Sequence, residues 1–386
     1  MHTEPVDILI AGGGPVGVAL ALGLQASGHS VVLTEARSAD PIGDHDAKPA
    51  DARAIALSYA SRLILERLNA WSGLDATPIE TIHVSQRGGF GRTLIRAAEC
   101  DVPALGYVVS YDNLLQCLLA VPCTGRRLFG AKLTGFDGTS ATIQTQGAEL
   151  AFAPRLTVFA DGARIADGRA AAAYTKDYRQ TAVVATVRAA QAHRGRAWER
   201  FTPQGPLALL PFGSSYSLVW TASPDRAAEL CDLDTPTFLS ELHTAFGDRL
   251  GEFLEAGRRA RFPLSLRYAR EEIQARSLCI GNAAQTLHPV AGQGFNLGLR
   301  DAWELARLAR DSDEPGSEAF CALYRRKRWL DRRAGIGCTD GLVDLFSNDN
   351  PLLGFGRGAG LLALDLLPFA RRFVARRMIY GARALP

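Results

Sequence analysis

The sequence predicts an α/β fold, α+β overall, in which a unit of parallel strands and helices contains an inserted mixed β-sheet and is followed by a C-terminal helical segment. Three observations favour this fold. An apolar run at 6–11 leads into a glycine-rich turn and a helix pattern, and a second strand, glycine-rich loop and helix follow at 278–309. The segments between them, at 181–221, are short, β-rich and separated by turn residues.

The composition is that of an ordinary globular protein. Of 386 residues, 47% are hydrophobic and 22% are charged, which excludes a disordered chain. A net charge of +3 gives no indication of nucleic-acid binding. Seven cysteines without a C-x-x-C pair, a polar N-terminus and no run of ~18 apolar residues predict a cytoplasmic protein without signal peptide or membrane span. The histidines show no metal-ligand spacing, so we expect no metal site.

The first element is a buried parallel strand at 6–11, followed by a turn and a helix at 18–26. The turn has the G-x-G-x-x-G spacing of a Rossmann-like dinucleotide site, whose glycines permit a tight turn, close approach of a pyrophosphate and helix–strand packing. Its predicted binding residues are Gly12, Gly14, Pro15 and Gly17. Glu35 follows the next strand, at 30–34, where a carboxylate accepts hydrogen bonds from a ribose hydroxyl. The pattern alone does not distinguish FAD from NAD.

A second glycine-rich loop follows a short strand at 278–280 and precedes an amphipathic helix pattern at 296–309. Like the first turn, it presents a helix N-terminus to a ligand. Two such turns need not bind two nucleotides, because one extended dinucleotide could be held at both ends. The binding residues predicted in this loop are Gly292, Gln293, Gly294, Phe295 and Asn296.

The second loop resembles a motif of the group A flavoprotein aromatic hydroxylases, which share the fold of p-hydroxybenzoate hydroxylase. That family has the pattern G-D-A-A-H-x-x-x-P-x-x-G-Q-G-x-N, which 281–296 match with Asn282 in place of the aspartate and Gln285 in place of the histidine. The wording G-N-A-A-Q-T-L-H-P is similar to the ubiquinone-biosynthesis hydroxylases. Further segments resemble the 2-polyprenyl-6-methoxyphenol hydroxylases of that group, at 81–85, 196–211, 217–220 and 339–343.

The resemblance implies further contacts with FAD. Arg53 lies in a D-x-R-A-x-A-L-S element whose arginine reaches the FAD phosphates, and Gln116 matches a glutamine that touches the flavin nucleotide. Asp161 matches the aspartate of a third motif, associated with FAD and NAD(P)H, and the Asn282 amide would bind a ribityl hydroxyl. After Asp161 the chain departs from the family pattern, since Ile165 stands at a serine position.

The catalytic candidates are His288 and Pro289, at the start of the loop that should face the reactive edge of the flavin. A general acid or base at His288 is one interpretation. The other, which we favour, is a loop histidine whose hydrogen bonds hold the loop in shape.

Converging motifs imply a discontinuous FAD-binding domain with a β-sheet substrate domain inserted in it. The expected boundaries are 1–75, 101–180 and 276–310 for the FAD-binding domain, 76–100 and 181–275 for the substrate domain, and 311–386 for a C-terminal helical region. The sheet should cover the isoalloxazine and line an apolar pocket with Leu209, Pro211, Phe212, Tyr216 and Trp220. The alternative is that these are half-buried sheet residues without ligand contact.

The C-terminal region interleaves leucine and phenylalanine with arginine, and no acid follows Asp365. A basic amphipathic segment is typical of peripheral contact with a membrane, here its inner face, and docking to a ubiquinone-biosynthesis complex would use the same surface. A core-packed helix with a solvated arginine face is the alternative.

The resemblance implies an FAD-dependent monooxygenase that acts in ubiquinone biosynthesis. NAD(P)H would reduce FAD, O2 would be activated as a flavin C4a-hydroperoxide, and one oxygen atom would pass to the aromatic ring of a polyprenylated phenol. One alternative is hydroxylation of another aromatic substrate or ring position in the same fold. Another is a non-catalytic FAD-binding subunit of a ubiquinone-biosynthesis complex.

Overall fold

The computed structural model describes residues 3–38, 54–162, 174–268, 275–347 and 350–382. Its first sheet has seven strands in the order β8-β2-β1-β11-β10-β9, with β18 beside β11. The parallel strands are β1 (Thr3–Ala11), β2 (Val31–Glu35), β8 (Arg126–Phe129), β11 (Glu149–Phe159) and β18 (Ser277–Cys279). An antiparallel extension consists of β9 (Lys132–Phe136) and β10 (Ala141–Gln144). The strands predicted at 6–11, 30–34 and 278–280 are confirmed.

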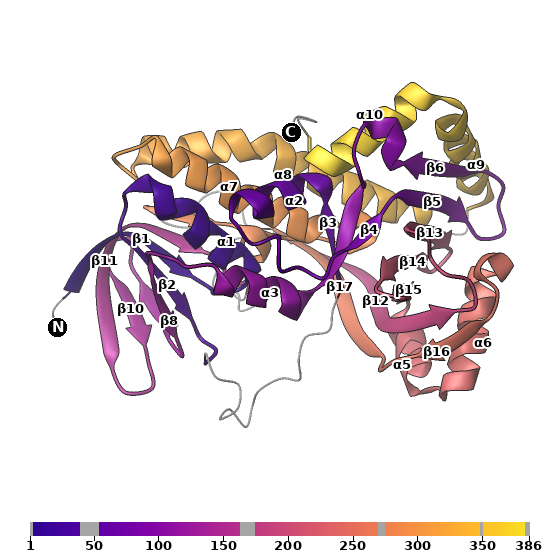
Figure 1. The fold of residues 1–386 in the computed structure, drawn as a ribbon, viewed down its shortest axis with the longest axis horizontal. Coiled ribbons are helices and arrows are strands. Elements are labelled where there is room, and N and C mark those ends of the chain that lie inside the picture. The colour runs from indigo at the N-terminus through magenta and orange to yellow at the C-terminus, as the bar shows by residue number, and fades with distance from the viewer. Residues whose placement is uncertain (1–2, 39–53, 163–173, 269–274, 348–349, 383–386) are drawn as a thin grey trace.

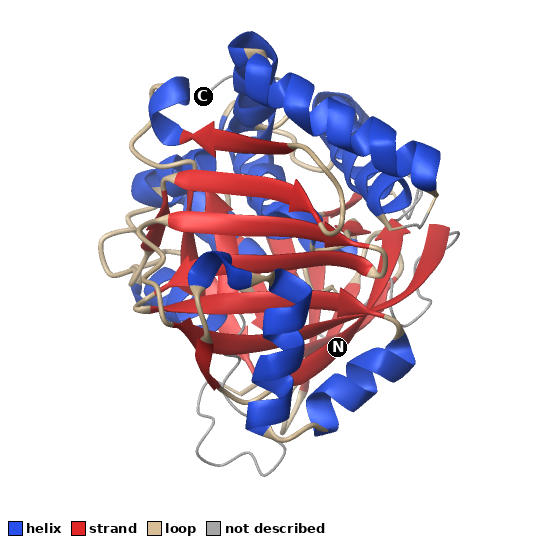
Figure 2. Ribbon diagram, turned by 90° about the vertical axis from the view of Figure 1, so that its right-hand side faces the viewer, coloured by secondary structure: helices blue, strands red, loops and turns tan. Residues whose placement is uncertain are grey.

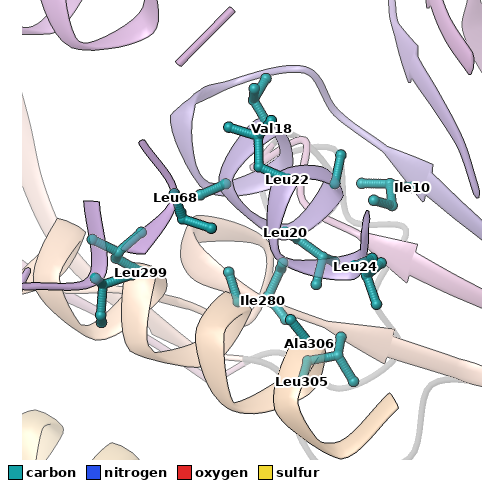
Figure 3. Packing of buried hydrophobic residues seen from close by; sticks show 14 of the residues in the cluster. Ile10, Val18, Leu20, Leu22, Leu24, Leu68, Ile280, Leu299, Leu305 and Ala306 are labelled. Carbon is teal, nitrogen blue, oxygen red and sulfur yellow. The ribbon is translucent and has the colours of Figure 1, made fainter. Parts of the chain in front are cut away.

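Two helices far apart in the sequence pack side by side on this sheet (Figure 1). These are α1 (Pro15–Gly23), which continues as η1 (Leu24–Ser27), and α7 (Gln293–Arg310). Figure 3 shows Leu20 and Leu24 of the first helix region beside Leu305 and Ala306 of α7. A Cβ atom on Gly23 would lie 2.8 Å from the Cβ of Ala306, so the helices approach closely where both residues are small.

A small sheet lies next to this unit. Its order is β3 (Ala54–Ser58), β7 (Gly106–Ser110) and β4 (Thr77–Ile79). Two of its strands lead directly into helices, α2 (Tyr59–Arg67) and α3 (Tyr111–Ala120). Ser58 and Ser110 cap these helices, since each hydroxyl accepts a hydrogen bond from the backbone N–H three residues later.

The largest sheet has nine strands in the order β19-β17-β12-β15-β14-β13-β5-β6, with β16 beside β12. It is mixed, because β13 runs parallel to β5 whereas its other pairs are antiparallel. Its strands come from four stretches of the chain: β5 (Thr81–Gln86) and β6 (Arg92–Arg96); β12 (Tyr174–Ala189), β13 (Arg196–Thr202), β14 (Gly205–Phe212) and β15 (Ser215–Ala222); β16 (Phe253–Ala256) and β17 (Ala260–Tyr268); and β19 (Gln285–Thr286).

The two faces of this sheet have different neighbours. On the outer face, alternate residues of β12 to β15 pack under α5 (Pro224–Asp232) and α6 (Thr235–Phe246), and helices cross in front of the strands in Figure 2. On the inner face, Leu210 and Phe212 contact Ile79 and Val108 of the small sheet. The inner face is therefore the one that looks toward the glycine-rich turns.

The chain ends in three helices, α8 (Glu318–Phe346), α9 (Pro351–Leu366) and α10 (Pro368–Tyr380). Within the described ranges, no single helix is long and apolar enough to cross a bilayer. Leu352–Leu366 and Pro368–Tyr380 meet that length and composition only as a pair, and they meet at a bend of 99°.

Candidate functional site

The first glycine-rich turn leaves no room for side chains at two of its positions. Gly12 has φ of +119°, and a Cβ atom there would lie 2.5 Å from the backbone nitrogen of Asp161. A Cβ atom on Gly17 would collide with the carbonyl oxygen of Gly12. Gly14 differs, because the nearest atom to its Cβ position is the Tyr111 hydroxyl at 3.6 Å. Gly12 and Gly17 thus close the turn, while the space beside Gly14 is open to a ligand.

The distal motif meets this turn. A Cβ atom on Gly162, next to Asp161, would lie 3.3 Å from the Cβ of Asn282, and both Asp161 and Asn282 are exposed. Further in, a Cβ atom on Gly298 of α7 would lie 2.9 Å from the Cα of Gly281. The structure therefore brings the predicted binding residues near 12, 161 and 282 together. Arg53 lies outside the described residues.

The two helices that begin at the glycine-rich turns lack side-chain caps. α1 begins after Gly14 with Pro15 in its first turn, and α7 begins after Gly292, and neither N-terminus accepts a cap from a side chain. Side chains cap α2, α3, α5, α6, α8 and α9, whereas α10, which begins at a proline, also lacks a side-chain cap. Free N–H groups and the positive end of each helix dipole make both N-termini suited to negative charge.

Glu35 lies beside the first turn. Its Oε2 atom accepts a hydrogen bond from the Gly13 N–H at 2.7 Å, and its Oε1 atom accepts from the backbone and guanidinium of Arg37 at 2.9 and 3.0 Å. Because a carboxylate has about four acceptor positions, one remains on Oε2. The expected ribose contact needs that position.

The side chain of Asn296 is buried and forms hydrogen bonds within the protein. Its amide oxygen accepts from the Ser58 N–H at 2.8 Å and the Ser61 hydroxyl at 2.7 Å, and its amide nitrogen donates to the carbonyls of Ala56 and Gly292. These bonds use its hydrogen-bonding capacity, and the residue is buried. The side chain of Asn296 therefore clamps α7 to β3 and α2, and the expected contact of this residue with the cofactor stays a prediction for its backbone.

The other predicted residues of this region take different positions. Gly292 has φ of +61°, and nothing lies within 4 Å of a Cβ position on Gly294. The Gln293 amide donates to the Met378 carbonyl of α10 at 3.5 Å, and Phe295 packs on the main core. Gln116 is exposed on α3, and Pro289 is exposed at the start of η6 (Val290–Gly292).

His288 is fully buried, with 0% of its surface exposed. Its Nδ1 atom accepts a hydrogen bond from the Val290 N–H at 3.1 Å, and its ring packs edge-on against Tyr178. Burial lowers the pKa of His288 to about 4, so the ring is neutral at physiological pH. This arrangement supports the shape-holding interpretation over acid or base catalysis.

The substrate-pocket candidates do not share one face of the large sheet. Leu209, Tyr216 and Trp220 are buried on the outer face beneath α5 and α6, and Pro211 pairs with Tyr216 on that same face. Phe212 lies on the inner face. Because side chains alternate along a strand, the packing of the first four favours the alternative of sheet residues without ligand contact, and a pocket toward the glycine-rich turns would use the other set.

Asp301 is a site residue that the sequence analysis did not single out. Its buried carboxylate accepts hydrogen bonds from the Gly281 N–H at 3.2 Å and the Gln285 amide at 2.8 Å, and it pairs with Arg328 at 2.7 Å. Burial opposes ionisation, but the Arg332 and Arg328 guanidinium groups hold the pKa of Asp301 below its usual value. The signal in the sequence was an aspartate on the apolar face of the helix at 296–309.

Comparisons with known proteins agree with this geometry. Residues 128–331 match the family model described as an FAD binding domain. The chain is 35% identical to the ubiquinone hydroxylase UbiL of Rhodospirillum rubrum, covering 96% of this chain and 89% of that protein. It is 33% identical to the 3-demethoxyubiquinol 3-hydroxylase of Escherichia coli, over 95% of this chain and 96% of that protein. Among solved structures, the p-nitrophenol 4-monooxygenase PnpA of Pseudomonas putida has a similar fold, with a TM-score of 0.76, 16% identity and coverage of 98% and 99%.

Proposed function

Because the chain belongs to the family of FAD-binding aromatic hydroxylases that includes the ubiquinone hydroxylases, we propose that it hydroxylates the ring of a polyprenylated phenol in ubiquinone biosynthesis. Its other substrates would be O2 and NAD(P)H. One structural observation carries the proposal. The distal motif packs on the first glycine-rich turn, because Gly281 and Gly298 lie against Val16 of α1 and Gly162 lies against Asn282, and both α1 and α7 begin without a side-chain cap. We call these two packed motifs the glycine cradle.

The residues present fit FAD. The open position at Gly14 and the α1 N-terminus would hold the pyrophosphate, and Glu35 would accept from the ribose. The exposed Asp161 and Asn282 would lie along the linker, and the N-terminus of α7 would favour negative charge on the flavin ring. When bound, FAD supplies the redox chemistry and the activation of O2.

The protein itself would position the cofactor and the aromatic ring and exclude water from the site. Asn296 and Asp301 hold the distal loop by its backbone, and the neutral His288 fixes the turn before η6. The inner face of the large sheet would hold the aromatic ring and exclude water from it.

Flavin content tests the proposal most directly. Purified protein should be yellow and should release FAD on denaturation. Gly14→Glu places a negative side chain where the pyrophosphate would lie, and we expect it to abolish FAD binding. Gly147→Glu is the matched control, because nothing lies within 4 Å of its Cβ position. Wild-type protein without flavin would contradict the proposal.

Turnover separates the hydroxylase from a non-catalytic FAD-binding subunit. We expect NAD(P)H oxidation to be stimulated by a soluble phenol, with one oxygen atom from O2 in the product. Expression in a strain that lacks the authentic hydroxylase should remove one specific ubiquinone intermediate, which identifies the ring position. Bound FAD without stimulated NAD(P)H consumption would favour the non-catalytic interpretation.

We further propose that α9 and α10 contact an anionic lipid surface, from which a polyprenyl chain would enter. Large apolar side chains point into solvent along both helices, with exposed fractions of 83% at Leu352, 68% at Phe355 and 73% at Phe369. Arginines accompany them, whereas the acid in this stretch, Asp365, accepts a hydrogen bond from the Leu94 N–H at 3.1 Å. An apolar face flanked by cations is typical of peripheral membrane contact.

A further inference from the structure

One row of residues crosses the inner face of the large sheet and is more accessible than its surroundings. In register from β5 through β13, β14 and β15 to β12, the row consists of Val84, Glu199, Ala208, Val219 and Val184. Every member is partly exposed, although the residues before and after most of them are buried on the opposite face. Four members are small and apolar, and Glu199 is the polar one. We call this set the Glu199 row.

The Glu199 row lies between the two parts of the candidate site. On the same strand and face, Ala197 packs with Ile79 and Val108 of the small sheet. At the other end, Phe201 packs with Val290, which lies in η6, and stacks on Phe346 of α8 with ring centroids 3.7 Å apart. Glu199 is therefore on the wall that faces the glycine-rich loop, with closed packing on either side.

One oxygen of the Glu199 carboxyl group has no partner among the described residues. Although the residue as a whole is partly exposed, its Oε1 atom is inaccessible to solvent and makes no hydrogen bond to any of them. A buried polar atom without a partner is costly, so such a group in a native protein calls for a ligand or another explanation. Within the part of the chain that the structure describes, no arginine or lysine forms an ion pair with Glu199, so the carboxyl group destabilises the fold and can accept a hydrogen bond from a ligand.

Burial alone raises the pKa of Glu199 to about 7, and no charged neighbour contributes. Among the described residues, the charged and titratable side chains that neighbouring elements hold near this face include Tyr107, Lys176, Tyr178, His288, Asp340, Asp344, Arg357 and Asp365. Each of them makes at least one hydrogen bond elsewhere in the protein, although Nε2 of His288 has no partner among those residues. The carboxyl group can therefore change its charge near neutral pH without a competing ion pair.

We propose that Glu199 is the subsite for the ring hydroxyl of the aromatic substrate, which donates its hydrogen bond to Oε1. This inference rests on the proposed function and deepens it, because it assigns the polar contact that orients the ring. The other members of the Glu199 row are alanine and valine, and each is partly exposed, so no large side chain of the row covers the carboxylate. The hydroxyl proton then passes to Glu199, the electron pair of the O–H bond stays on the phenolic oxygen, and the ring becomes more electron-rich toward an electrophilic oxygen.

Binding of two small compounds tests this assignment. 2-Prenylphenol carries the hydroxyl, and its methyl ether has nearly the same shape without the donor. We expect wild-type holoenzyme to bind the phenol at least tenfold more tightly than the ether, and Glu199→Leu to abolish that difference, since a hydrogen bond to a charged group is worth ~1.5–3 kcal/mol. Glu255→Gln, in an exposed pair with Arg188, is the matched control and should behave as wild type.

The pH profile provides a readout that a structural role would not move. In the wild type, kcat/KM for the phenol should rise with pH through about 7, as Glu199 loses its proton, and Glu199→Gln should remove this limb. In the binding experiment, the wild type should lose its preference for the phenol over the methyl ether below that pH, and this test needs no variant. A wild type that binds phenol and ether equally, or a Glu199→Gln enzyme that keeps the limb, would overturn the assignment. Protein without FAD would instead refute the proposed function.

Discussion

At the scale of single residues, glycines of the same motif do different work. Gly17 lacks space for a side chain because the Gly12 carbonyl occupies it, whereas Gly14 has ordinary contact distance to its nearest neighbour. The first supports the fold and the second leaves room for a ligand. A motif written as G-x-G-x-x-G does not separate these roles, and the neighbouring atoms do.

Substitution of these glycines should separate stability from binding. In FAD-free protein, Gly17→Ala should lower the free energy of unfolding by ~1–3 kcal/mol because a methyl group must displace backbone. Gly14→Ala should leave it within ~0.5 kcal/mol. Urea unfolding followed by circular dichroism measures both. Equal losses in the two variants would show that the turn is not packed as described.

The residues that bind could be predicted only where a motif names them. Gly12, Asp161 and Asn282 were expected to meet, and the structure brings them together because β1 and β18 both flank β11. The pocket residues were harder, since a β-rich segment does not reveal which of its two alternating sets faces the loop. Leu209 and Tyr216 belong to the set that packs beneath α5 and α6, and the sequence pattern did not reveal this.

At the scale of elements, α7 holds the distal loop in place. Its Asp301 binds the backbone of Gly281 and the amide of Gln285, and two arginines of α8 neutralise it. Arg328 also pairs with Asp331, which pairs with Arg300 of α7. The helix was predictable from its apolar periodicity, but this network was not, because its partners lie on a separate helix.

Removal of the central charge should release both the helix pair and the loop. Asp301→Asn leaves buried arginines without their counter-charge, and we expect a loss of ~3–5 kcal/mol in the free energy of unfolding. FAD affinity should fall as well, because the Gly281 N–H loses its charged acceptor. Asp248→Asn, whose side chain is 97% exposed, should change the free energy of unfolding by less than ~0.5 kcal/mol. A stable Asp301→Asn protein with normal FAD affinity would argue against this role.

At the scale of the whole molecule, the sequence predicted the kinds of layers but not their pairing. The mixed sheet was expected from 76–100 and 181–275, and β5 and β6 come from the first of these ranges, whereas β19 joins the sheet from the distal motif. The parallel pairing of β13 with β5 brings together segments that no local pattern connects. Long-range pairing of this kind depends on the packing of the complete chain.

If α9 and α10 contact lipid, substitutions on their exposed apolar residues should weaken binding to vesicles. Phe369→Asp and Leu366→Asp remove exposed apolar area and add negative charge, so each should weaken sedimentation with phosphatidylglycerol vesicles at least tenfold. Added salt should weaken wild-type binding, and neutral phosphatidylcholine vesicles should bind less protein. Leu254→Asp, at an exposed leucine of β16, is the control. Unchanged binding in all three variants would assign this surface to something other than lipid.

The position of α7 near the end of the chain has a consequence for the order of synthesis. The first half of the glycine cradle leaves the ribosome with β1 and α1, but β18, the Asn282 turn and the N-terminus of α7 follow only after the whole inserted sheet. A nascent chain that stops before residue 277 therefore has one of the two helix N-termini and lacks the strand that completes the parallel layer beside β11. We therefore expect FAD to bind only after synthesis has passed α7. A chain that ends before that point lacks half of the cradle and should stay without FAD.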